Sequence, residues 1–222
     1  MNIMQKKPKV AAVIPFFNEQ ETLPVVINQT LPFADLIIAV NDGSTDDFLK
    51  HIRINERIVL ISSKKNEGKG FSINRGMKKS MELNSDITIT LDADLQHPPE
   101  YIPQLIEMLK YYDIVIGNRL RNLRGMPFQR ILSNKLSSVL LSIKLKQVIS
   151  DSQCGFRAYK TSILHDILPL SKGYEAETEI LVNAKRKNYS IGFAEIPTIY
   201  TNRKSRMRSF KTIRGFLRVL FT

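Results

Sequence analysis

Tryptophan is absent from this sequence of 222 residues, and cysteine occurs once, as Cys154. A single cysteine excludes an internal disulfide framework and a cysteine-based zinc site. Glycine and proline, with 10 residues each, are too few for a collagen-like or low-complexity chain. No stretch approaches the roughly 18 uncharged apolar residues of a bilayer-spanning helix. Pro15 and Asn18 interrupt the first apolar run, so we expect no signal peptide.

Acidic residues are scarce as well: 21 Asp and Glu face 33 Lys and Arg, which gives a net charge of +12. None follows Glu195, whereas the last twenty residues contain seven Lys or Arg. Such a basic end indicates an anionic partner, namely a membrane surface, a phosphorylated ligand or a nucleic acid. The length and the 43% of apolar residues suit one domain with a proper core.

Apolar β-branched runs alternate with helical patterns along the chain. The runs predict strands at residues 9–14, 36–40, 58–62, 87–91 and 114–117. Helices are predicted at residues 19–30, 70–83 and 99–111. This alternation is typical of an α/β domain whose mainly parallel central sheet is flanked by helices. Such sheets bind ligands beyond the carboxyl ends of their strands, so we expect residues 18–19, 41–46 and 92–96 to gather at one edge.

The strongest motif lies at residues 92–96, directly after a predicted strand. Carboxylates at positions i and i+2 of an extended segment point the same way, and unpaired they would repel each other. A divalent cation such as Mg²⁺ or Mn²⁺, which takes carboxylate, amide and phosphate oxygens, relieves this repulsion. We therefore predict a metal site at Asp92, Asp94 and Gln96, with a solvated turn as the alternative. His97 is expected to serve the helix start.

Three other segments have both a functional and a structural interpretation. Asp42 can accept hydrogen bonds from a base or ribose, or it belongs to a plain turn that caps a helix. The aromatic residues before Asn18 offer a ring for stacking on a base, or simply end a strand. Lys69, in a glycine-rich segment, is a phosphate partner or part of a surface turn; the segment lacks the P-loop spacing.

In their order, these motifs resemble those of glycosyltransferase family 2, most closely the dolichyl/polyprenyl-phosphate mannose synthase group: IPFFNE, NDGSTD, NEGKG, DADLQHPPE, DIVIGNR and DSQCGFRAYK. The resemblance runs from about Val10 to Arg208. It implies the GT-A nucleotide-diphospho-sugar transferase fold, which we expect over residues 1–202, followed by a basic amphipathic segment at 203–222.

The resemblance also implies roles for particular residues. Donor binding falls to Pro15, Phe17, Glu19, Val40, Asp42, Asp92, Ala93, Asp94, Arg119 and Arg206. The catalytic residues would be Asp94, Arg119, Arg130 and Ser133. The chain departs from the family pattern at Phe17, where a Tyr is common, and at Gln129, which occupies the place of the acceptor-phosphate Arg and leaves Arg130 one position later.

The implied reaction is the metal-dependent, inverting transfer of a hexose, mannose or glucose, from GDP-mannose or UDP-glucose to a polyprenyl or dolichyl phosphate. The cation, Arg119 and Arg206 would neutralise the leaving diphosphate. An acceptor phosphate is already ionised and needs no strong base. A family 2 enzyme of cell-envelope glycan synthesis with a sugar hydroxyl acceptor is the alternative, and it would need a base such as Glu177. Nucleic acid is not expected as a partner, because no recognition motif accompanies the charge.

The remaining candidate residues have either a role in the active site or a purely structural role. Glu177 and Glu179 belong to the site or to a solvated helix start. Cys154 is expected to be a small packed residue, with Asp151 and Arg157 in a loop-stabilising or acceptor-side role. Residues 209–222 place apolar and basic side chains at helical spacing, which is typical of an interfacial helix on anionic lipid, although a helix packed on its own domain fits too. We expect a cytoplasmic protein, peripheral on the inner face of the membrane.

Overall fold

The computed structural model describes residues 7–121, 126–199 and 209–221. Its described strands form one sheet of seven, in the order β3-β2-β1-β4-β6-β5-β7. They are β1 (Val10–Phe16), β2 (Leu36–Asn41), β3 (Ile58–Ser62), β4 (Ile87–Thr90), β5 (Ile114–Asn118), β6 (Arg157–Lys160) and β7 (Ile191–Glu195). Only β6 runs antiparallel to its neighbours β4 and β5. The carboxyl ends of the other strands and the amino end of β6 therefore share one edge.

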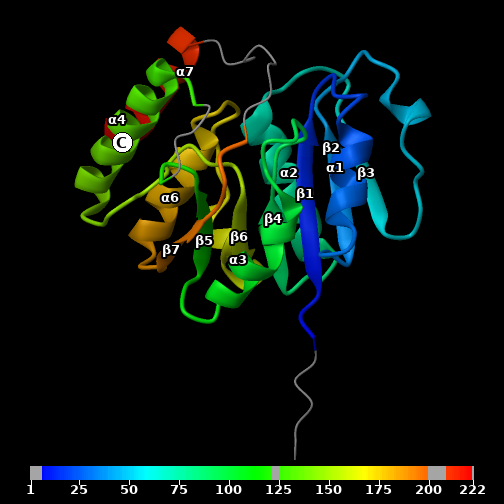
Figure 1. Ribbon diagram of the computed structural model, residues 1–222, viewed down its shortest axis with the longest axis horizontal. Helices are drawn as coiled ribbons and strands as arrows, with labels where there is room; N and C mark the ends of the chain where they lie inside the picture. Colours follow the sequence, from blue (N-terminus) through cyan, green and yellow to red (C-terminus); the bar gives the residue numbers. More distant parts are fainter. Residues whose placement is uncertain (1–6, 122–125, 200–208, 222) are drawn as a thin grey trace, which may run out of the picture.

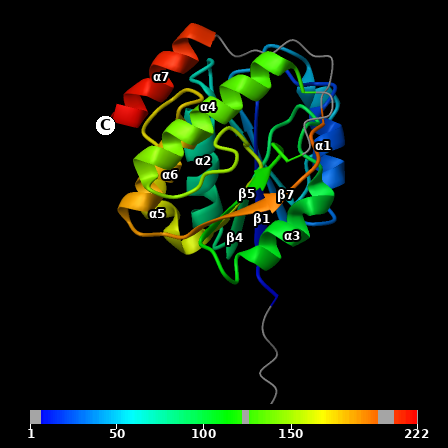
Figure 2. The same ribbon diagram turned by 60° about the vertical axis from the view of Figure 1, so that its left-hand side comes forward.

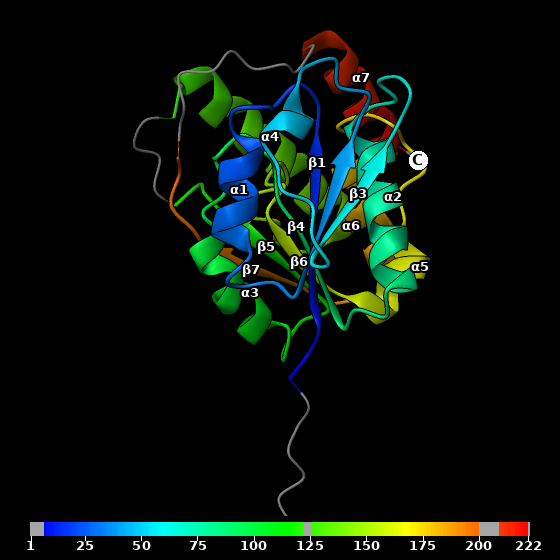
Figure 3. The ribbon, with the colours of Figure 1, turned by 90° about the vertical axis from the view of Figure 1, so that its right-hand side faces the viewer.

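Helices cover both faces of this sheet (Figures 1 and 3). The α-helices are α1 (Leu23–Thr30), α2 (Lys69–Glu82), α3 (Ile102–Met108), α4 (Phe128–Leu145), α5 (Leu164–Ile167), α6 (Ala176–Arg186) and α7 (Ser209–Phe221). Short 3₁₀ turns are η1 (Phe48–Lys50), η2 (Pro99–Tyr101) and η3 (Thr161–Ile163). Helix α2 packs on β1, β2, α5 and α6, while α3 contacts β5, β6 and β7. Figure 3 shows α1 and α3 on one side of the sheet and α2, α5 and α6 on the other.

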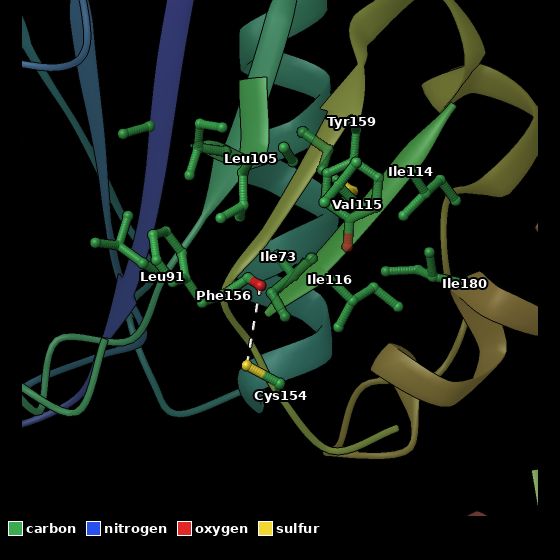
Figure 4. Packing of buried hydrophobic residues seen from close by; sticks show 14 of the residues in the cluster. Ile73, Leu91, Leu105, Ile114, Val115, Ile116, Cys154, Phe156, Tyr159 and Ile180 are labelled. Atoms are coloured by element: carbon green, nitrogen blue, oxygen red, sulfur yellow. Dashed lines mark hydrogen bonds between the residues drawn. The ribbon is translucent and has the colours of Figure 1, made fainter. Parts of the chain in front are cut away.

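The core lies between the sheet and these helices (Figure 4). Ile114, Val115 and Ile116 of β5 are fully buried, and Ile180 of α6 packs in the same cluster. Cys154 is buried among these residues, and burial raises the pKa of its thiol to about 12. A thiol held neutral in this way packs as a small apolar group, which confirms the structural interpretation of Cys154.

The predicted α/β class and mainly parallel sheet are confirmed, and all five predicted strands are present within a residue or two of the expected bounds. The helix predicted from residue 19 begins only at Leu23, because Asn18 has a positive φ of 54° and Pro24 favours a first turn. The helix predicted over 99–111 is a 3₁₀ turn followed by α3, with Pro103 in its first turn. Strands β6 and β7 and helices α4, α5 and α6 were not predicted.

The helix predicted at the C-terminal end is present as α7. It packs on α4 and α6 and contributes Val219 and Leu220 to the core. The described residues include no helix with the length and apolar character needed to cross a membrane.

Candidate active site

The Asp92-Ala93-Asp94 segment leaves the sheet at the end of β4. Leu91 is fully buried and anchors it, and the N–H of Asp92 donates to Nδ1 of His97 at 3.0 Å. Burial lowers the pKa of His97 to about 4, so this imidazole is neutral and accepts that hydrogen bond. His97 thus holds the backbone of the turn at Asp92, which is a structural role. The N–H of Gln96 donates to Oδ1 of Asp94 at 3.1 Å, and Leu95 completes the turn at a positive φ of 66°.

Lys69, the first residue of α2, reaches into this turn. Its Nζ lies 2.7 Å from Oδ1 of Asp92 and 3.1 Å from Oε1 of Glu177. Burial alone would lower the pKa of Lys69, but the charges of Asp92 and Glu177 raise it above its usual value. A Cβ at Gly155 would lie 2.8 Å from Oε1 of Glu177 and 3.1 Å from Oδ2 of Asp92. The three charged groups therefore form one compact cluster against the backbone of Gly155.

The two aspartates of the turn have opposite electrostatic environments. Burial would raise the pKa of Asp92, but the nearby charge of Lys69, assisted by Arg119, lowers it to about 2. Burial and the charge of Asp92 raise the pKa of Asp94 to about 6, and Glu19 adds to the repulsion. The end of β1, which carries Glu19, and the end of β4 thus bring carboxylates together, as parallel strand ends predict.

This donor set fits a divalent cation. The described residues contain no group of three or more His, Cys, Asp and Glu side chains placed to hold a metal ion. Mg²⁺, however, is usually bound by one or two carboxylates, and substrate phosphates and water complete its octahedron. At Asp94, burial and the charge of Asp92 outweigh the attraction of Lys69 and raise the pKa, so a bound cation would relieve this repulsion. Asp92 and Asp94, with the Gln96 amide nearby, are the side chains that would hold such an ion.

The end of β2 forms a second loop at this edge. The carboxylate of Asp42 accepts the N–H groups of Glu67 and Gly68, each at 2.9 Å. At Gly43, where φ is 76°, a Cβ would lie 2.7 Å from Asn66 N, so the turn needs glycine. Asp42 therefore ties its own loop to the segment before α2. The structural alternative, a turn that caps a helix, is wrong in this detail, because η1 begins after Asp47 and has no side-chain cap. The role of Asp42 in donor binding stays a prediction.

The other donor-binding candidates differ in what their side chains can reach. Phe17 and Glu19 are partly exposed at the end of β1, and Oε2 of Glu19 accepts a hydrogen bond from Thr22 at 2.8 Å. Pro15, Ala93 and Val40 are buried. The Val40 side chain packs within a separate apolar cluster beneath α2, so only its backbone is left to face a ligand.

Arg119 follows β5 at the same edge. Its Nε and Nη2 donate to the two carboxylate oxygens of Asp151 at 2.9 and 3.1 Å, a bidentate arrangement that fixes the guanidinium plane. Asp151 is fully buried. Arg157, also fully buried, donates to the carbonyl oxygens of Ser152, Cys154 and Glu177. It thereby ties the 152–154 segment to the start of α6, which is the loop-stabilising role.

Glu177 and Glu179 have different environments. Glu177 is only 7% exposed, so the solvated helix start is wrong for this residue. The carboxylate of Glu179 accepts the N–H groups of Leu170 and Ser171 and holds the loop before α6. Arg130 and Ser133 lie in the first two turns of α4, where Oγ of Ser133 donates to the Arg130 carbonyl at 3.1 Å. Arg206 lies outside the described residues.

The sequence does not disclose the pairing of Lys69 with Asp92 and Glu177. These residues come from α2, the end of β4 and α6, and no local pattern links them. Nor does it disclose the clamp of Asp151 on Arg119. Two signals were available: Lys69 opens a helix after a glycine, and the DSQCGFRAYK motif carries both Asp151 and Arg157.

Sequence comparisons connect this chain to known proteins. Residues 11–168 match the protein-family model described as Glycosyl transferase family 2. The UDP-N-acetylglucosamine–dolichyl-phosphate N-acetylglucosaminyltransferase of Methanococcus voltae is 31% identical over 213 residues, covering 85% of this chain and 85% of the relative. The undecaprenyl-phosphate 4-deoxy-4-formamido-L-arabinose transferase of Proteus mirabilis is 31% identical over 179 residues, covering 76% of this chain and 54% of that relative.

Solved structures give the same fold. The glucosyl-3-phosphoglycerate synthase of Mycobacterium tuberculosis, in complex with Mn²⁺, UDP-glucose and phosphoglyceric acid, has a TM-score of 0.76 at 20% identity. The likeness covers 96% of this chain and 80% of that one. It establishes the expected GT-A fold.

Proposed function

Because this chain belongs to glycosyltransferase family 2, we propose that it transfers a sugar from a nucleoside diphosphate to a polyprenyl phosphate. One observation carries the proposal: the carboxyl edge of the sheet brings Asp92 and Asp94 together with two cations, Lys69 and Arg119. Carboxylates bind the divalent ion, and the cationic side chains bind the diphosphate, so the two kinds of group together suit a diphosphate–metal complex better than either kind alone.

The site residues would divide the work on the donor. Asp92 and Asp94, with Gln96, would hold Mg²⁺ or Mn²⁺, and this ion would supply positive charge to the leaving diphosphate. Arg119, kept in plane by Asp151, would add a second positive charge at the same place. The neighbouring charge lowers the pKa of Asp92, so this carboxylate stays ionised over the working pH range.

The base and ribose would lie at the ends of β1 and β2. Phe17 would stack on the base, and Asp42 and Glu19 would accept hydrogen bonds from the base or ribose while keeping their loops in place. Arg206 would cover the diphosphate. Support for a uridine nucleotide comes from the Methanococcus voltae relative, whose name specifies UDP-N-acetylglucosamine.

The acceptor is proposed from the same relatives, since two of them are named for dolichyl-phosphate and undecaprenyl-phosphate. A phosphate monoester is ionised at neutral pH, so its oxygen can attack the anomeric carbon without a general base. Arg130 and Ser133, at the start of α4, would position this phosphate. Attack in line with the departing diphosphate inverts the anomeric centre. A hydroxyl acceptor would instead need a base, and Glu177, the best candidate, is engaged with Lys69.

The test is a transfer assay with a panel of labelled donors: UDP-glucose, UDP-N-acetylglucosamine and GDP-mannose. Each is combined with undecaprenyl or dolichyl phosphate and Mg²⁺ or Mn²⁺, and label is counted in the organic phase. We expect one donor to give organic-soluble product that EDTA suppresses. Label moving only to water-soluble acceptors would contradict the proposed acceptor. We place the reaction at the cytoplasmic face of a membrane, where the sugar would be joined to its lipid carrier. The expected sugar is a hexose, either mannose or glucose.

A further inference from the structure

Helix α4 is amphipathic in the reverse sense of an ordinary surface helix. Five large apolar side chains, each 55–76% exposed, follow one another at spacings of four, four, three and four residues: Phe128, Leu132, Leu136, Val139 and Ile143. Such spacing places them along one face of the helix. A contiguous exposed apolar row of this kind marks an interaction surface, whereas single exposed apolar residues need no explanation.

The opposite face of α4 is the one buried against the domain, and much of it is polar. Asn134, Ser137 and Ser138 are buried there. Oγ of Ser137 lies 3.1 Å from Oγ of Ser152 and accepts a hydrogen bond from Nε2 of Gln153 at 2.9 Å. These hydrogen bonds hold α4 on the segment that carries Asp151. The apolar row therefore faces outward, because the polar side chains on the opposite face of α4 have hydrogen-bond partners inside the domain.

Helix α7 lies beside α4 and adds a second row. Nζ of Lys144 donates to the carbonyl oxygen of Leu220 at 2.6 Å, and Figure 2 shows the two helices running side by side. Val219 and Leu220 of α7 are buried and belong to the core of the domain. Ile213, Leu217 and Phe221, four residues apart, are exposed. We call the exposed side chains of these two rows the α4–α7 surface.

The charges around this surface are mainly basic, and the acidic side chain beside α7, Glu175, is paired with Arg218. The sequence between Leu120 and Ser150 contains six Lys and Arg and no acidic residue, and no acidic residue follows Glu195. Lys135, Lys146 and Arg214 are exposed on or next to the two helices. An apolar row bordered by basic side chains is the pattern of helices that lie in the headgroup region of anionic bilayers. A soluble partner would have to combine an apolar groove with an acidic rim.

We propose that the α4–α7 surface docks on an anionic lipid bilayer, with both helices lying in its interface. The purpose of this docking rests on the proposed function, because Arg130 lies in the first turn of α4 and Arg119 directly follows β5, the strand before this helix. Docking would then bring the start of α4, and with it the sugar-transfer edge, to the phosphate of a membrane-bound acceptor. Binding itself depends only on the surface.

The experiment measures co-sedimentation of the full chain with vesicles of phosphatidylcholine alone or mixed with phosphatidylglycerol. The variant is Leu132→Gln with Leu136→Gln, which removes apolar area and adds no charge. The control is Leu49→Gln with Ile54→Gln in and after η1, because Leu49 is as exposed as the α4 leucines, 58% against 59% and 57%, and Ile54 is 51% exposed. Circular dichroism and thermal melting check that each variant is folded.

Wild type and control should bind the anionic vesicles, and more weakly at high salt. The partition coefficient of the α4 variant should be lower by about tenfold or more, since two leucine side chains are no longer buried in the bilayer. Equal sedimentation of variant and wild type, or no preference for anionic vesicles, would overturn the proposal. A dimer in lipid-free solution that the α4 variant abolishes would overturn it in favour of a second copy. Transfer to a short water-soluble prenyl phosphate should be unchanged in the variant. Vesicle binding by a wild-type chain that shows no transfer activity would refute the proposed function but not the docking of the α4–α7 surface.

Discussion

The ammonium group of Lys69 lies 2.7 Å from Oδ1 of Asp92, the first carboxylate of the predicted metal site. The same group is 3.1 Å from Oε1 of Glu177, so two largely buried carboxylates from different parts of the chain share one cation. At the neighbouring Asp94, burial together with the charge of Asp92 outweighs the attraction of Lys69 and raises the pKa to about 6. The carboxylates of this cluster thus outnumber its lysine, which favours the binding of a further cation beside Asp94.

Replacing Lys69 should expose this balance as a stability effect. Lys69→Met leaves Asp92 and Glu177 close together without their common cation, and the free energy of unfolding should fall by about 3 kcal/mol. Mn²⁺ should restore part of the loss, because it can neutralise Asp92. Denaturant titration with and without Mn²⁺ measures both effects. Lys79→Met is the matched control: its partner Glu82 is 63% exposed, and the loss should stay under about 0.5 kcal/mol.

Asp151 should act on turnover through Arg119. Asp151→Asn removes the buried charge that fixes the guanidinium, and we expect kcat to fall about tenfold or more because Arg119 no longer meets the developing charge in one geometry. Arg119→Lys, which cannot form the bidentate contact, should give a comparable loss. The double variant should be little worse than either single one, since both remove the same arrangement. Additive losses in kcat would show that the two residues act independently.

Divalent-ion affinity should depend on pH through Asp94. Because the pKa of Asp94 is raised from 3.8 to about 6, a proton competes with the ion below that value, and Mn²⁺ affinity should rise as the pH passes from about 5 to about 7.5. Asp92, whose pKa is lowered to about 2, remains ionised throughout. Without the ion, this raised pKa means that the folded chain binds more protons than the unfolded one, so the Asp94 contribution to stability falls as the pH rises. Stabilisation by Mn²⁺ should therefore be largest above pH 6. A Mn²⁺ affinity that is constant with pH would contradict this account.

The first half of the fold could be predicted from the sequence because its strands are short β-branched runs closed by turn residues. Ile58–Ser62 is an example whose predicted bounds are those of β3. The second half escaped this approach. The buried side of α4 includes Asn134, Ser137 and Ser138, and its exposed side is apolar, so its pattern does not fit that of a core helix. Strand β6, Arg157–Lys160, begins with a buried arginine that no strand pattern favours. Both depend on tertiary hydrogen bonds.

The candidate site, too, could be predicted only in part from the sequence. Asp92, Asp94 and Gln96 could be predicted as metal ligands because two carboxylates at a strand end repel each other unless a cation lies between them. The residues that organise them, Lys69 and Glu177, are far apart in sequence and meet only in the folded chain. Val40 shows the converse: its motif position suggested the nucleotide pocket, but strand alternation turns its side chain into an apolar cluster.

The central claim is that the turn at Asp92 and Asp94 binds a nucleoside diphosphate together with a divalent cation. Calorimetric titration of UDP and GDP into the chain, with Mn²⁺ or with EDTA, tests it directly. We predict that Mn²⁺ tightens the binding of one nucleotide by about tenfold or more, and that Asp94→Asn abolishes this gain. Asp47→Asn, at an exposed pair with Lys50, should retain it. Nucleotide binding of equal strength in EDTA, or a Mn²⁺ gain that survives Asp94→Asn, would contradict the account.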